Sequence, residues 1–181
     1  MDTQSFFTRR VLPGIAFLAL LLFAGPACLP DMAQVERSIQ IKAPIAVVFE
    51  QVNDLKKNEA WSPWSANDET LVTSYGATTI GKGASSSWTS ENSGDGSMVI
   101  TESTPYSQIL IALDFKEQGK AESYWKFSEA NGEVTVTWGF TQKPESIGEQ
   151  FFALLIDSFI GPYYEEGLEK LKAVAEGQAN S

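Results

Sequence analysis

Residues 146–174 read SIGEQFFALLIDSFIGPYYEEGLEKLKAV and predict a long amphipathic helix at the end of the chain. Ser146 followed by Glu149 fits a capping box, which marks the start of a helix. Apolar residues then recur at every fourth position, a spacing that places them on one helix face. Because Pro162 lacks an amide hydrogen, we expect a kink or break at Gly161-Pro162. The apolar face comprises Ile147, Phe151, Leu155, Phe159 and Tyr163, continued by Leu168, Leu171 and Val174. Residues 177–181 are expected to form a flexible tail.

Short strands separated by turn signals are predicted before this helix. Apolar and polar residues alternate from Val35 to Lys42, and a short helix is expected after Pro44. Asn131-Gly132 is the best hairpin signal among the later turns. Since these connections are too short for helical crossovers, the later strands form an antiparallel meander. They are expected at residues 70–75, 84–90, 96–102, 108–115, 121–128 and 133–141. The predicted fold class is α+β, with a curved seven-stranded antiparallel sheet wrapped around the C-terminal helix.

Composition limits what this chain does. Its 181 residues, 43% of them hydrophobic, suit one folded domain. A net charge of −10 disfavours nucleic acid as a partner. The sequence contains no histidine, which excludes Ser-His-Asp and Cys-His catalysis and histidine-ligated zinc. We therefore expect no cofactor, no metal site and no recognisable catalytic constellation.

The first 28 residues predict a signal peptide or a membrane anchor. Arg9 and Arg10 precede an uncharged run of 19 residues from Val11 to Leu29. Three fates fit this pattern: an uncleaved anchor helix, a lipoprotein modified at Cys28, and an ordinary cleaved signal. The two arginines place the N-terminus inside and the domain outside by the positive-inside rule. The protein is thus expected to be exported, and to be membrane-anchored, periplasmic or extracellular.

The expected organisation beyond this segment is simple. Residues 29–34 form a linker and residues 35–176 form the folded domain. Cys28 is the only cysteine, so the chain has no intramolecular disulfide.

Several short motifs, taken in order, resemble the SRPBCC superfamily. They are Ile41-Lys-Ala-Pro44, Trp61-Ser-Pro-Trp64, Gly81-Lys-Gly83 before a strand with Trp88, Gly94-Asp-Gly96, Val136-Thr-Trp138 and Gly167-Leu-Glu-Lys-Leu171. More narrowly, the chain looks like the polyketide cyclase/dehydrase and lipid-transport group, which has a START-like helix-grip fold. The resemblance covers residues 35–176. It implies a cavity between the sheet and the last helix that holds a hydrophobic molecule, and it supplies no catalytic residue.

The candidate ligand-binding residues are large and apolar, as the lining of such a cavity requires. For each of them, ordinary core packing is the alternative interpretation. The candidates are Trp61, Trp64, Trp88, Trp125, Trp138, Phe151, Leu155 and Phe159.

Asp114 and Glu102 are the candidate catalytic residues, because Asp114 lies next to Phe115 in an otherwise apolar predicted strand and Glu102 ends another. A carboxylate facing the interior would have a raised pKa and serve as an acid or base. A solvated position on the outer face is the alternative. Arg37 has the same strand parity as Ile39 and is the one basic residue that is a candidate for facing inward.

The favoured function is binding of a small hydrophobic ligand, lipid or polyketide-like, on the outer side of a membrane and without chemistry. It requires an enclosed cavity of some hundreds of cubic ångströms. A cyclase or hydrolase-like enzyme is the second hypothesis, and it requires an inward-facing carboxylate. A protein-interaction module of the chaperone-cofactor type is the third, and it requires a large exposed apolar patch.

Overall fold

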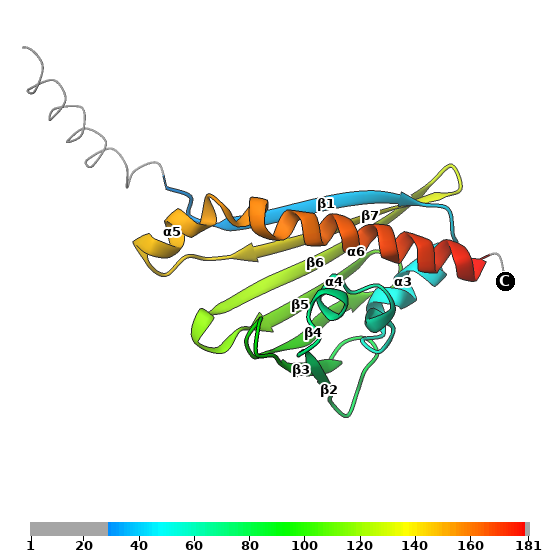
Figure 1. The fold of residues 1–181 in the computed structure, drawn as a ribbon. Helices are drawn as coiled ribbons and strands as arrows, with labels where there is room; N and C mark the ends of the chain where they lie inside the picture. Colours follow the sequence, from blue (N-terminus) through cyan, green and yellow to red (C-terminus); the bar gives the residue numbers. More distant parts are fainter. Residues whose placement is uncertain (1–28, 180–181) are drawn as a thin grey trace, which may run out of the picture.

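A curved sheet wraps around a long helix in the computed structural model, which describes residues 29–179 (Figure 1). The predicted signal or anchor segment and Cys28 lie outside the described residues. Among the described residues, none of the helices has the length and apolar character needed to cross a membrane.

The sheet has seven antiparallel strands in the order β1-β7-β6-β5-β4-β3-β2, so the predicted meander is confirmed. Asn131 and Gly132 both have positive φ, as a two-residue hairpin turn requires. β1 begins at Ala33, inside the expected linker. The strands are β1 (Ala33–Ile41), β2 (Val72–Tyr75), β3 (Ser85–Thr89), β4 (Gly96–Thr104), β5 (Gln108–Asp114), β6 (Lys120–Ala130) and β7 (Glu133–Gln142).

The helices cover one face of this sheet (Figure 1). They are α3 (Ile45–Asn53), α4 (Pro63–Asn67), α5 (Ile147–Ala153) and α6 (Ile156–Ala179), with short 3-10 turns η3 (Lys57–Ala60) and η4 (Lys116–Gln118). The predicted capping box is confirmed, since the Ser146 hydroxyl accepts a hydrogen bond from the Glu149 amide. α6 continues to Ala179, into the segment expected to be a flexible tail from residue 177, and Gln178 accepts a hydrogen bond from the buried Gln51.

The C-terminal helix differs from the prediction in where it breaks. The break falls at Leu154-Leu155, between α5 and α6, whereas Pro162 lies inside α6. Arg37 of β1 bridges the helix across this proline. Its guanidinium donates to both oxygens of Asp157 at 2.7 and 3.1 Å and to Glu165 at 2.7 Å. A Cβ at Gly161 would lie 2.3 Å from this guanidinium, so the glycine makes room for the contact.

Only the C-terminal half of the predicted apolar face packs on the sheet, since Leu168 and Leu171 are buried as expected and the residues before them are not. The buried side chains of α6 include Ile156, Tyr164, Leu168 and Leu171. The predicted row at every fourth position is exposed instead, from 37% at Tyr163 to 62% at Ile147. Because α-helical periodicity is 3.6 residues, the two sets occupy different faces of a helix that is apolar on both.

Candidate apolar binding site

Aromatic rings fill the centre of the grip. Trp125 of β6 stacks on Trp138 of β7 at 4.5 Å between ring centroids, and Trp138 stacks on Tyr164 of α6 at 3.8 Å. Trp61 meets both tryptophans edge-on. The indole N–H of Trp61 donates to the Gln51 carbonyl and that of Trp138 to the Ser123 hydroxyl. These three predicted ligand-binding tryptophans are therefore buried and packed on each other or on α6, which is the alternative interpretation given above.

Trp88 lies in a different environment, at the end of the sheet near α5. Its ring covers Gly96, where a Cβ would lie 2.2 Å from it, and it meets Phe115 edge-on at 5.9 Å. Met98 and Leu113 are paired across β4 and β5 on the same inner face. All four side chains are only half-buried. We call Trp88, Met98, Leu113 and Phe115 the open-end cluster.

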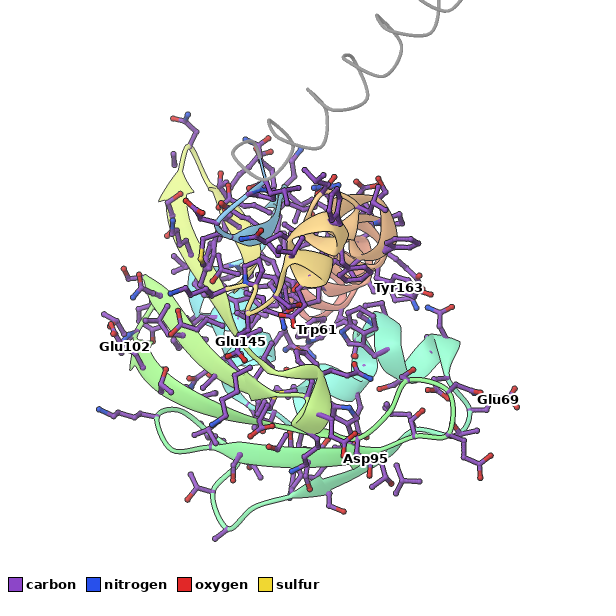
Figure 2. All side chains as sticks on the ribbon, turned by 90° about the vertical axis from the view of Figure 1, so that its left-hand side faces the viewer. Trp61, Glu69, Asp95, Glu102, Glu145 and Tyr163 are labelled. Atoms are coloured by element: carbon purple, nitrogen blue, oxygen red, sulfur yellow. The ribbon has the colours of Figure 1, made fainter. Side chains whose placement is uncertain are left out.

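The inner face is sealed further along the same strands. Ile100 and Ile109 are completely buried, and Ile111 nearly so. On the inner face of β4 and β5, the partly exposed apolar side chains therefore lie at the end of the strands that holds Met98 and Leu113. Figure 2 looks onto this end, with Trp61 lying between the helices and the sheet.

The two candidate carboxylates lie on the outer face. Glu102 is exposed, accepts hydrogen bonds from Thr104 and Gln108, and points away from Trp61 in Figure 2. Asp114 has the strand parity of the exposed Ala112 and accepts a hydrogen bond from the Lys116 amide at 2.8 Å. Neither residue meets the requirement of an inward-facing acid.

The buried carboxylate belongs to Asp68, which the sequence analysis missed. It accepts hydrogen bonds from Thr70, Ser90, Asn92 and Ser93, with the Ser93 hydroxyl at 2.6 Å. These donors hold the pKa of Asp68 well below its usual range. A carboxylate that stays ionised and fully bonded suits a structural tie between residues 68–70 and the β3–β4 turn. The spacing Asp68-x-Thr70 is the only local signal for it.

The remaining predicted ligand residues form surface. Phe151, Leu155 and Phe159 are each more than half exposed, and Trp64 stacks on Tyr163 at the surface. Phe152 stacks on Phe159 at 5.8 Å and extends the exposed area. We call the exposed set on α5 and the start of α6 the α5 patch: Ile147, Phe151, Phe152, Leu154, Leu155 and Phe159.

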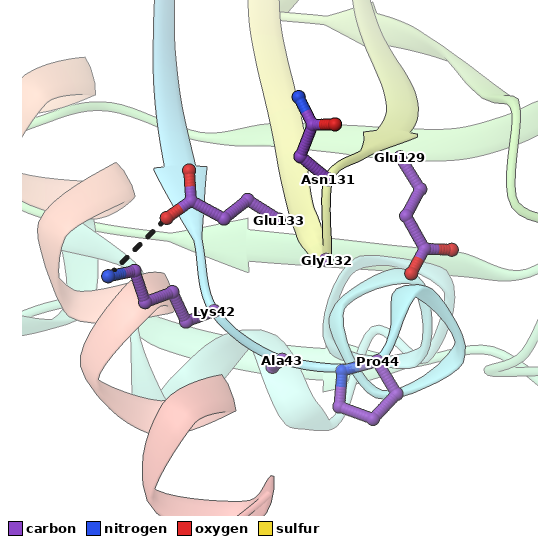
Figure 3. Close-up of a pocket in the computed structure, with 7 residues that line it drawn as sticks. All are labelled: Lys42, Ala43, Pro44, Glu129, Asn131, Gly132 and Glu133. Atoms are coloured by element: carbon purple, nitrogen blue, oxygen red, sulfur yellow. Dashed lines mark ion pairs between the residues drawn. The ribbon is translucent and has the colours of Figure 1, made fainter.

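Among the described residues, two surface hollows bear on the expected cavity. One, of about 590 Å³, is open to solvent and lies between residues 42–44 and the β6–β7 turn (Figure 3). Lys42 and Glu133 form an ion pair across it at 3.4 Å. The other, of about 60 Å³, is lined largely by charged and amide side chains near η4. Neither is the enclosed aromatic cavity that the sequence predicts.

A family model described as "Polyketide cyclase / dehydrase and lipid transport" matches residues 32–176. A search of curated proteins found no match.

Solved structures share the fold at low identity. Protein CV1439 from Chromobacterium violaceum is 15% identical with a TM-score of 0.56, over 80% of this chain and 97% of that one. The Aha1 dimer from Colwellia psychrerythraea is 14% identical with a TM-score of 0.57, over 79% and 96%. CalU16 from Micromonospora echinospora is 14% identical with a TM-score of 0.53, over 80% and 74%. At these identities the likeness shows the fold alone.

Proposed function

The chain belongs to the polyketide cyclase / dehydrase and lipid transport family of the SRPBCC superfamily, and from that premise we propose that it binds a hydrophobic small molecule at the open-end cluster. One observation carries the proposal. Trp88, Met98, Leu113 and Phe115 face the interior of the grip and remain partly exposed, whereas Ile100, Ile109 and Ile111 further along β4 and β5 are buried. Apolar side chains left accessible on a concave face are what a hydrophobic ligand covers.

The chemistry of the cluster suits one end of an amphiphile. Two aromatic rings, a thioether and a leucine offer flat and adaptable apolar contacts. Ser86 is buried on the same face opposite Met98 and adds one hydroxyl. An apolar lining with few polar groups selects for shape and hydrophobicity, so the ligand class is a lipid or a polyketide-like molecule.

We place this binding site on the outer side of a membrane. The support comes from the sequence, in which Arg9 and Arg10 precede the uncharged run that ends at Leu29. Only residues 30–32 separate that run from β1. In a tethered domain whose apolar site lies near the tether, a ligand dissolved in the bilayer travels only a short distance to the site.

Binding without conversion is favoured over the enzyme alternative. A cyclase or hydrolase-like reaction needs an acid or base beside the ligand. Glu102 and Asp114 lie on the outer face, and the Asp68 carboxylate accepts hydrogen bonds from four residues. The interaction-module alternative is supported by the exposed apolar side chains of the α5 patch.

Replacing Met98 tests the proposal. The full chain is purified in mild detergent, extracted with organic solvent, and analysed by mass spectrometry for copurifying lipid. Met98→Trp fills the open end and is expected to lower the bound lipid to background. Val99→Trp, its neighbour on the outer face with 40% exposure, is the matched control and keeps the lipid.

Leu113→Gln is a second test variant. It makes the cluster more polar at similar side-chain volume, so it tests ligand binding even where Met98→Trp fails to fold. Equal amounts of lipid in all four proteins, or lipid in none of them, would rule out ligand binding at this cluster.

A further inference from the structure

The α5 patch is an apolar surface that no other part of residues 29–179 covers. Its six side chains are between 51% and 62% exposed, and Phe152 stacks on Phe159 across the break between α5 and α6. Folded domains seldom leave so many large apolar side chains together in water, and such patches mark an interface. We infer that the α5 patch rests in the lipid bilayer beside the N-terminal segment. The inference builds on the membrane tether of the proposed function.

The topology puts the patch where the chain enters the domain. Ala33, the first residue of β1, pairs with Gln142, the last of β7, and α5 starts five residues later at Ile147. Figure 1 shows the start of β1 beside α5 at one end of the molecule. Met32, directly before β1, is also exposed and adds to the apolar surface there.

The length of the connection limits the distance to the membrane. Three residues, 30–32, link the uncharged run to β1, and at ~3.5 Å per extended residue they span at most about 10 Å. With residues 11–29 in a bilayer, the end of the domain that carries α5 stays at the headgroup layer. Apolar helix faces that bind membranes sit about 5–10 Å deep at this boundary, within reach of the patch.

The charges around the patch decide what kind of lipid contact this is. Acidic residues prevail in its surroundings, and Arg37 is already bound by Asp157 and Glu165. The acids are Asp31, Glu145, Glu149 and Asp157, against Lys143. Contact therefore rests on apolar insertion, and zwitterionic lipid suits it better than anionic lipid.

The same charges disfavour a second copy as the occupant. Pairing two α5 patches would bring two acidic borders together on a chain of net charge −10.

The patch also lies at the same end as the open-end cluster, so a ligand leaving the bilayer reaches the cluster directly.

Depth measurement in vesicles tests the inference. The full chain carrying Cys28→Ser and Leu155→Cys is labelled with an NBD fluorophore and reconstituted into dioleoylphosphatidylcholine vesicles. Lipids brominated in the acyl chains are expected to quench the label strongly, and aqueous iodide only weakly. The matched control is Ser128→Cys in the same background, an exposed site near the far end of β6, where iodide quenches and brominated lipid does not.

A second pair of variants tests whether the patch itself makes the contact. Phe159→Glu is expected to restore iodide quenching at position 155, whereas Val72→Glu, an equally exposed apolar site on β2, leaves the label in lipid.

Other outcomes overturn the inference. A label at 155 that is open to iodide means that the patch faces water. A label shielded from both quenchers means that protein covers the patch, either a second copy, a partner or residues 15–24. Flotation of the chain with the vesicles reports on the tether separately, so a floating chain with an unquenched label refutes the patch contact and leaves the tether standing. A chain that does not float refutes both, whereas lipid extraction still tests ligand binding.

Discussion

Asp68 illustrates how a carboxylate becomes structural. An isolated buried charge costs several kcal/mol of solvation, roughly, and is kept only when hydrogen bonds replace water. Here the donors come from two segments, Thr70 beside it and residues 90–93 across the sheet edge. Their preference for the ionised form lowers the pKa of Asp68 and couples the fold of this corner to pH.

The pH dependence of stability has a defined sign. Since the pKa of Asp68 is lower in the folded than in the unfolded state, its contribution is complete above about pH 4, the unfolded value, and is lost as pH falls below it. Asp68→Asn is expected to lower the melting temperature at pH 7, and the difference from the parent is expected to shrink as the pH falls below 4.

The exposed neighbour Glu69 supplies the control, because Glu69→Gln is expected to melt like the parent throughout. Thermal melts of the three proteins from pH 3 to 7 make the comparison. A constant gap between Asp68→Asn and the parent over that range would contradict the assigned role.

The tryptophans show what sequence can predict at this scale. Trp125 and Trp138 lie in predicted strands as candidates for cavity lining or core packing, and both are buried. Whether a buried indole lines a cavity depends on what stands opposite, here Tyr164 and Trp61 from distant segments. No local sequence pattern predicts which distant residue packs on an indole. Trp64 is a second case, since the residue that stacks on it at the surface is Tyr163 of α6.

At the scale of elements, the C-terminal helix explains the main error. It carries apolar residues on two faces, and periodicity alone does not say which face meets the sheet. Gly161 and Gly167 are the sequence features that identify the face of α6 that meets the sheet. A Cβ at Gly167 would lie 2.9 Å from the Trp138 ring, so small residues mark where α6 approaches the core. Both glycines share a face with Tyr164 and Leu168, whereas Phe151 and Phe159 do not.

The bridge from Arg37 to α6 yields a prediction for this element. Arg37→Met keeps the side-chain length and removes the ion pairs with Asp157 and Glu165 on either side of Pro162. Two partly exposed pairs with good geometry are expected to contribute about 1 kcal/mol to the free energy of unfolding. The loss should diminish at high salt, because ions screen exposed charges.

Urea denaturation at low and high salt measures this effect. Lys42→Met is the control, since it removes one longer and more exposed pair with Glu133 and is expected to change the free energy of unfolding less. An Arg37→Met protein as stable as the parent at low salt would show that α6 holds its course through Pro162 without the bridge.

For the whole molecule, three features converge on one end. The open-end cluster on β3–β5, the α5 patch and the entry of the chain into β1 lie toward the same end of the strands, the end at which β7 leads into α5. The meander from β2 to β7 was predictable, because each of its turns is local, whereas β1 pairs with β7 from the other end of the chain. This convergence was not, because it depends on the register of β1 against β7 and on the face that α6 buries. Because aromatic rings fill the interior, we propose the open end and not a central cavity as the ligand site.

Photo-crosslinking with a diazirine-bearing fatty acid tests ligand binding at the open end most directly. The full chain is irradiated with the probe in phosphatidylcholine vesicles, and the modified peptides are identified by tandem mass spectrometry. Our account predicts adducts within residues 96–100 and 111–115, which hold Met98, Leu113 and Phe115, and loss of these adducts in Met98→Trp but not in Val99→Trp. Adducts confined to α5, with none on these strands, would contradict it.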